Sequence, residues 1–191
     1  MMVLEDRKIA GVDAKTALWM GILTIASVAS TVAFECGVPF AALAALAALT
    51  TRRRDALAMV ALVWLASVTT GFLALGYPVR ASSIAWTFFM LGGALAGAIA
   101  AQMIAERTQR FGPAVMALAA LAGAYASYKL AILLGYQFLG GGERSFAPDV
   151  LLLQVRVETA FLVGLMILHR AVVLLGVTPP SPAMSPRLAR P

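Results

Sequence analysis

Charged residues are scarce in this chain, and their scarcity excludes an ordinary soluble domain. Only 13% of the 191 residues are Asp, Glu, Lys or Arg, and 61% are hydrophobic, whereas soluble domains have about 25% charged residues. The mean hydropathy is +0.88. Since a membrane-spanning helix needs about 20 apolar residues, we predict an all-α, polytopic integral membrane protein. Its spans leave no room for a separate catalytic or nucleotide-binding domain.

Cysteine and histidine are scarcer still. The chain has a single cysteine, Cys36, and a single histidine, His169. One of each excludes a Cys/His metal cage, a bis-histidine haem site and a disulfide within the chain. The motifs of serine hydrolases, zinc metallopeptidases and P-loop nucleotide-binding proteins are also absent from the sequence. We therefore expect no metal, no cofactor and no enzymatic activity.

The basic residues that are present follow a pattern along the chain. Six apolar stretches alternate with short polar breaks, and most Lys and Arg residues fall on every second break. One side of the membrane would collect ten of them (Arg7, Lys8, Lys15, Arg52, Arg53, Arg54, Arg107, Arg110, Arg187 and Arg190), and the other side two (Arg80 and Arg144). Because cytoplasmic loops are enriched in Lys and Arg, we predict a bacterial-type inner-membrane protein with both termini in the cytoplasm. The net charge of +6 is then explained by basic residues that flank the spans and face the lipid bilayer, which is the expected partner. We do not expect the protein to bind nucleic acid.

The predicted organisation has three parts. A cytoplasmic N-terminal segment covers residues 1–15, a six-helix transmembrane domain covers residues 16–177, and a disordered Pro-rich cytoplasmic tail covers residues 178–191. The predicted spans are residues 16–34, 38–51, 55–75, 82–104, 113–138 and 149–177. The second is about 21 Å long, a length also compatible with a re-entrant helix. We predict that it crosses, with local bilayer thinning or burial of its outer end, because otherwise every later loop would change sides.

Small residues mark a close-packing face on the fourth span. Gly93 and Gly97 form a GxxxG motif, and Ala96 and Ala100 follow one step along. Helices in lipid gain no hydrophobic attraction for each other, so close backbone approach over small residues holds them together. Two interpretations are open, namely a docking face for another subunit and packing within the six-helix bundle.

Three charged residues are predicted at one depth in the outer half of the membrane. Lys129 lies about 13 Å below the outer end of the fifth span, and Arg156 and Glu158 lie about 11–14 Å below the start of the sixth. Ionisable residues at such a depth usually face a partner or a cavity. Because consecutive antiparallel spans are expected to be neighbours, we predict a Lys129–Glu158 ion pair, with Gln154 on the Glu158 face. Arg156 points elsewhere, toward Glu35, backbone carbonyls or a ligand.

These groups favour a pocket that opens to the outside. The candidate ligand-binding residues are Lys129, Arg156, Glu158, Gln154, Tyr125, Tyr128, Glu35 and Trp86. Such a set suits a small polar or anionic metabolite. The alternative is a structural ion pair with an Arg side chain that extends to the headgroups, and a solvated turn for Glu35. His169 and Arg170 are predicted to lie together at the inner headgroups.

Three hypotheses about function follow. In the first, the protein binds or translocates a small metabolite, as the substrate-binding subunit of a multi-component transporter. Its span count and size are similar to those of the substrate-binding subunits of vitamin transporters that use a separate ATPase module, which is a comparison of architecture. In the second, it is a structural or assembly subunit that docks on partner membrane subunits. In the third, Glu35, Glu158 and Lys129 line an ion or proton pathway.

Overall fold

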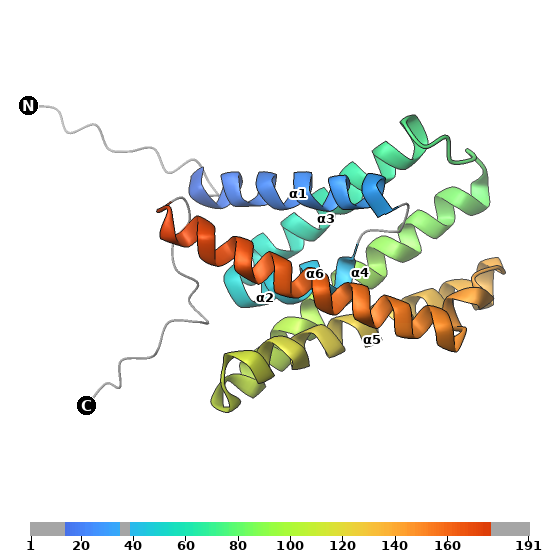
Figure 1. Cartoon of the computed structure of the whole chain (residues 1–191). Helices are drawn as coiled ribbons and strands as arrows, with labels where there is room; N and C mark the ends of the chain where they lie inside the picture. Colours follow the sequence, from blue (N-terminus) through green and yellow to red (C-terminus); the bar gives the residue numbers. More distant parts are fainter. Residues whose placement is uncertain (1–13, 35–38, 177–191) are drawn as a thin grey trace, which may run out of the picture.

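The computed structural model of the protein describes residues 14–34 and 39–176, which form a bundle of six α-helices (Figure 1). The helices are α1 (Ala14–Phe34), α2 (Phe40–Thr50), α3 (Arg53–Leu73), α4 (Ala81–Thr108), α5 (Pro113–Leu139) and α6 (Pro148–Leu174). Two short 3₁₀ turns, η1 (Gln109–Phe111) and η2 (Glu143–Phe146), follow α4 and α5. No strand occurs in these ranges. The predicted tail, residues 178–191, lies outside them.

Four helices, α3 to α6, are long and apolar enough to cross a membrane. They begin and end within four residues of the predicted spans, and the largest difference is at the end of α4. Pro113 and Pro148 stand at the start of α5 and α6, where the missing N–H of proline costs nothing. The all-helical fold is therefore confirmed, and its four long apolar helices are consistent with a membrane helical bundle.

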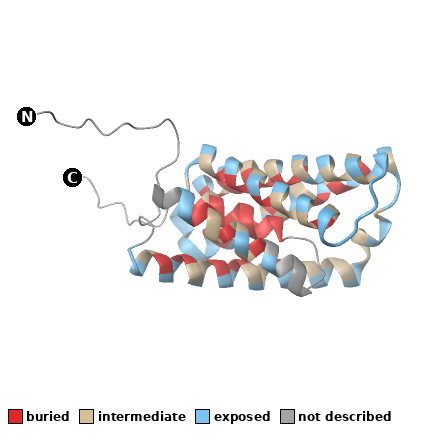
Figure 2. Ribbon diagram, turned by 90° about the horizontal axis from the view of Figure 1, so that it is seen from above, coloured by how far each residue is buried: buried red, intermediate tan, exposed pale blue. Residues whose placement is uncertain are grey.

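The short helix α2 lies at the centre of the bundle. Its 11 residues span about 16 Å, which is half of a bilayer core of about 30 Å. All of them except Ala48 are buried, and Figure 2 shows this buried region as the middle of the molecule. The burial extends over the whole helix and is not confined to its outer end.

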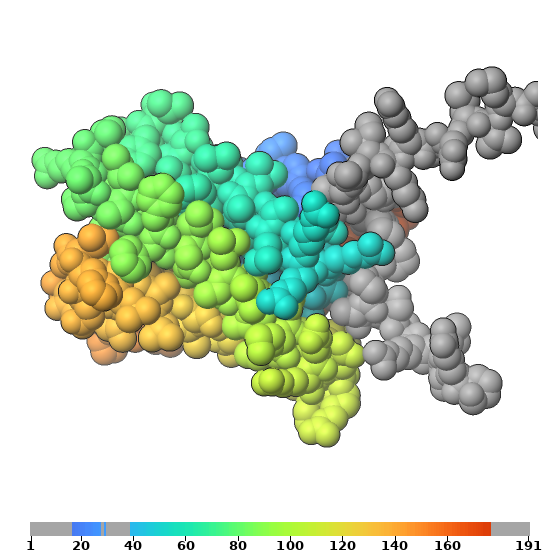
Figure 3. Space-filling view, turned by 180° about the vertical axis from the view of Figure 1, so that it is seen from behind, coloured from blue at the N-terminus to red at the C-terminus, as the bar shows by residue number. Residues whose placement is uncertain are grey.

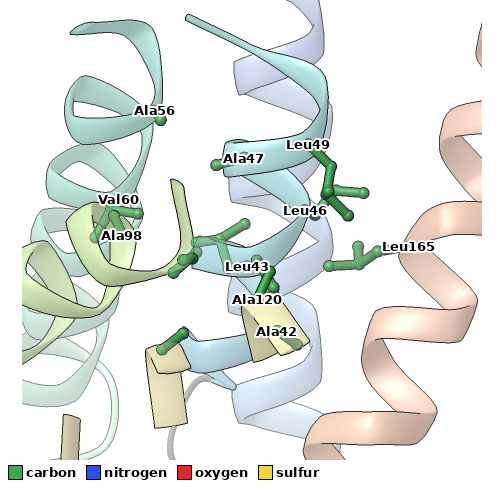
Figure 4. Close-up of a cluster of buried hydrophobic side chains, with 14 of the residues drawn as sticks. Ala42, Leu43, Leu46, Ala47, Leu49, Ala56, Val60, Ala98, Ala120 and Leu165 are labelled. Carbon is green, nitrogen blue, oxygen red and sulfur yellow. The ribbon is translucent and has the colours of Figure 1, made fainter. Parts of the chain in front are cut away.

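The neighbours of α2 come from every later helix. Figure 4 shows its leucine and alanine side chains directed toward Val60 of α3, Ala98 of α4, Ala120 of α5 and Leu165 of α6. Seen from behind, α3, α4 and α5 form a continuous face (Figure 3). A helix that is apolar on all sides is suited to such a position, and its alanines allow four helices to approach it closely.

The GxxxG motif of α4 packs inside the chain. A Cβ atom on Gly97 would lie 3.0 Å from the Ala124 carbonyl oxygen, and one on Gly93 would lie 2.7 Å from the Ala131 Cβ, both on α5. Ala96 is exposed and Ala100 is half-buried. The glycines therefore allow the close contact of α4 with α5, and their faces are not free for another subunit.

Helix α6 lies at the edge of the bundle and packs through one narrow stripe. Its buried residues are Glu158, Leu162, Leu165, His169 and Val172, which recur every three or four positions as one helix face does. The stripe faces mainly α2. The rest of α6 is largely exposed apolar surface. Two of the five inward positions are thus polar, and both polar side chains lie within a membrane-type bundle.

Candidate functional site

The Glu158 carboxylate lies at the start of α2. The backbone N–H of Ala42 donates a hydrogen bond of 2.7 Å to Glu158 Oε2, and the N–H of Ala41 also bonds to this carboxylate. The residue before α2 is Pro39, which provides no side-chain cap. The first N–H groups of a helix lack partners within the helix, and a negative group there is favoured by the helix dipole. Glu158, 116 positions further along the chain, therefore acts as the missing cap.

The Lys129 ammonium lies beneath the loop that joins α5 to α6. Lys129 Nζ donates a hydrogen bond of 2.7 Å to the Ser145 carbonyl oxygen. It also lies 5.6 Å from the centre of the Tyr125 ring and 5.4 Å from that of Phe146, distances typical of cation–π contacts. The Lys129 side chain is buried. Its direct partners are thus one neutral carbonyl and two aromatic faces.

The predicted Lys129–Glu158 ion pair is wrong. Within the described residues Lys129 bonds to Ser145 and Glu158 bonds to α2, although the two charges still interact at longer range. The physical reason is the position of α2, which packs against both α5 and α6 while those two helices barely touch. Helices α5 and α6, which are consecutive in sequence, therefore each pack mainly against other helices and touch one another at few points.

Other predicted residues surround the two charged groups. The Tyr125 hydroxyl lies 3.4 Å from Gln154 Oε1, which links α5 to α6. The Tyr128 ring lies 5.9 Å from that of Phe40, at the first turn of α2, and its hydroxyl interacts electrostatically with Glu158. These residues lie at about the same height along the bundle as Lys129 and Glu158, as predicted from their positions along the two helices.

Two predicted residues are not part of this group, and a third lies beside it against Gly135 of α5 and the loop. Arg156 is exposed on the outer side of α6, as expected for a position two residues from Glu158. Glu35 lies outside the described residues. Trp86 packs against the α5–α6 connection, where a Cβ on Gly142 would lie 3.4 Å from its ring.

The loop at residues 140–142 is recognisable in the sequence as the longest outer loop, but its contact with Lys129 is not. We call residues 140–147 the lid segment. Gly140, Gly141 and Gly142 have φ values of 68°, 73° and 90°, a backbone region that favours glycine. They turn the chain so that η2 folds back over the bundle and places Ser145 and Phe146 on Lys129. The three consecutive glycines before Pro148 were the signal for this turn, but its contact with Lys129 is visible only in three dimensions.

A second polar cluster lies toward the other end of the bundle. The rings of Trp19 and His169 lie 5.1 Å apart, with exposed fractions of 2% and 3%. In the part of the chain that the structure describes, Trp19 Nε1 and His169 Nδ1 have no hydrogen-bond partner. His169 faces inward and only Arg170 is exposed, so the two side chains do not lie together on one surface as predicted. Their depth at the inner headgroups stays a prediction.

Comparison with known proteins gives no indication of the function. No family model, no curated protein and no solved structure matches the chain. In residues 14–34 and 39–176, no three His, Cys, Asp or Glu side chains gather as a metal site would require. Among the described residues, Lys129 and Glu158 are the Lys, Arg, Asp or Glu side chains that are buried.

Proposed function

We propose that the protein binds or translocates a small anionic metabolite at Lys129, in the outer half of a bacterial-type inner membrane. The observation that carries the proposal is the set of partners around the Lys129 ammonium, which are neutral. A buried charge is costly unless it is paired. An anion at this position would supply the pairing that the carbonyl and the rings do not.

The contrast with Glu158 supports an anion as the ligand. The Glu158 carboxylate is offset by the N–H groups of α2, so its charge has direct partners within the chain. The Lys129 ammonium has no carboxylate at hydrogen-bonding distance among the described residues. A cation held by a neutral carbonyl can exchange that partner for a carboxylate or phosphate oxygen, which accepts a stronger, charge-assisted hydrogen bond.

The course of the chain supports six crossings with both termini in the cytoplasm. Figure 1 shows α1, α3 and α5 running in one direction and α2, α4 and α6 in the other. The basic turns at residues 52–54 and 107–110 then lie at the same end, and Lys129 lies nearer the opposite end. By the positive-inside rule, the basic end is cytoplasmic and the lid segment faces outward, so the site would receive its ligand from outside.

The proposed site consists of Lys129 with Tyr125, Gln154 and the lid segment around it. Tyr128 and Glu158 form its floor with the first turn of α2. Arg156 is outside the site because it points away from the bundle.

Mass spectrometry of the protein released mildly from its own membranes tests the proposal. We expect a bound small anion that is lost in Lys129→Met and kept in Arg156→Met. The second variant removes an equal charge from the outer side of α6, so it controls for net charge. Retention of the anion in Lys129→Met, or a folded wild-type protein that carries no anion, would overturn the proposal.

The alternative function, a subunit of a larger membrane complex or a partner of an ATPase module, is favoured by one observation. The outer side of α6 exposes Leu152, Leu153 and Val163 around Arg156, and a charged residue on an apolar membrane face is costly without a partner. The same spectra distinguish this case, because stoichiometric protein partners without a small ligand would indicate a subunit. Those partners should dissociate in Arg156→Met.

A further inference from the structure

The start of α2 is an unusual place for a helix to begin in a membrane protein. Figure 1 shows that α2 begins part-way along the bundle, between the other helices, and Pro39 and Phe40 are buried. Backbone N–H groups cannot find water at such a position. The N–H of Leu43 bonds to the Pro39 carbonyl at 3.1 Å, whereas those of Ala41 and Ala42 depend on Glu158.

The charged groups around Glu158 are few. From α5 it faces Lys129, Tyr125 and Tyr128, which interact with it electrostatically. Helix α2 has no titratable residue. Glu143 and Arg144 of η2 are exposed, as is Arg156 on the far side of α6.

We infer that Glu158 is a proton-binding site inside the bundle, and that its protonation releases the first turn of α2. A carboxylate accepts hydrogen bonds with both oxygens, whereas a carboxylic acid uses part of that capacity to donate one. A neutral acceptor also holds N–H groups more weakly than a charged one and gains little from the helix dipole. Since a helix of 11 residues is marginal without its contacts, loss of the cap loosens its first turn.

Loosening of the first turn of α2 would also weaken the contact between α2 and α6. Glu158 is the first buried residue on the stripe through which α6 packs on α2. Leu162 and Leu165 follow Glu158 on that stripe and separate it from His169. The proton therefore binds without a polar continuation along α6, which distinguishes a binding site from a pathway. The inference does not depend on anion binding at Lys129.

Infrared difference spectroscopy of the full chain in lipid nanodiscs, stepped from neutral to acidic pH, tests proton binding directly. We expect the band of a protonated carboxyl in a dry environment in the wild type, its loss in Glu158→Gln, and its retention in Asp149→Asn. Asp149 is an exposed carboxylate in the first turn of the same helix, so it is the matched control. An unchanged band in folded Glu158→Gln, or its absence from the wild type, would overturn the inference.

Hydrogen exchange tests the release of α2 and keeps the inference falsifiable if Glu158→Gln does not fold. In the wild type, acidification should speed amide exchange of residues 40–46 relative to the buried part of α4, residues 94–105, after correction for the intrinsic pH dependence. In Glu158→Gln the difference between the two segments should be present at neutral pH and should not grow on acidification. Equal protection of both segments at every pH would overturn the release of α2.

Discussion

Helices α2 and α6 are both strongly apolar, yet the structure places them in opposite environments. All of α2 except Ala48 is buried, whereas α6 is buried along one stripe and otherwise exposed. Their sequences differ in side-chain size, since six of the 11 α2 residues are alanine and α6 has Leu, Val and Ile on its outer side. In a membrane, hydrophobicity does not separate core from surface, because lipid is as apolar as the core. Small side chains do so by letting backbones approach.

The largest effect is expected where a close backbone contact is broken. Gly97→Leu should destabilise the protein by about 3 kcal/mol or more, because its new side chain would meet the backbone of Ala124. Gly164→Leu on α6, where no atom lies within 4 Å, should be close to neutral. Unfolding of both variants in mixed detergent measures the difference. Equal stabilities would mean that α4 and α5 are not packed as described.

Removal of the cap of α2 is expected to have the next largest effect. Glu158→Leu leaves two buried N–H groups of α2 without their acceptor, which should lower the free energy of unfolding by about 2 kcal/mol. Glu158→Gln should cost less, because an amide oxygen still accepts. Asp149→Leu at the exposed start of α6 is the control. A Glu158→Leu protein as stable as the wild type would show that the cap contributes nothing.

Truncation of one leucine on each of the two helices tests the difference in their burial. Leu46 on α2 is fully buried and Leu153 on α6 is 56% exposed. Leu46→Ala should cost about 1–2 kcal/mol, less than the roughly 3 kcal/mol typical of soluble cores, because only packing is lost and no transfer from water is involved. Leu153→Ala should cost almost nothing. The same detergent unfolding assay applies, and a larger loss for Leu153→Ala would indicate that a partner covers α6.

The smallest effect is expected on the outer side of α6. Arg156→Leu should leave the stability of the isolated protein within about 0.5 kcal/mol of the wild type, since Arg156 is exposed. Unfolding of the purified protein measures this value. A marked loss of stability would mean that Arg156 has a partner within the chain, and Glu35 would then be the residue to change next.

Much of the candidate site could be predicted from the position of each residue along its helix, which gives its depth in the membrane. Lys129, Glu158, Tyr125 and Gln154 were predicted at one level because a helix rises by a constant length per residue, and the structure brings them together. The sequence did not correctly predict which of these residues contact one another, since Lys129 and Glu158 do not form an ion pair. The pairing depends on how α2 packs against both α5 and α6, and the periodicity of one helix carries no information about its neighbours in space.

The amino-acid sequence is sufficient to predict an all-helical protein of membrane type and, to within a few residues, where each long helix begins and ends. Apolar length, proline and glycine act locally, so these features needed no tertiary contact. The central position of α2, its cap by Glu158 and the cover of Lys129 by the lid segment are visible only in three dimensions. These outcomes depend on the fit of small side chains between helices distant in sequence, and that fit exists only once the bundle has assembled.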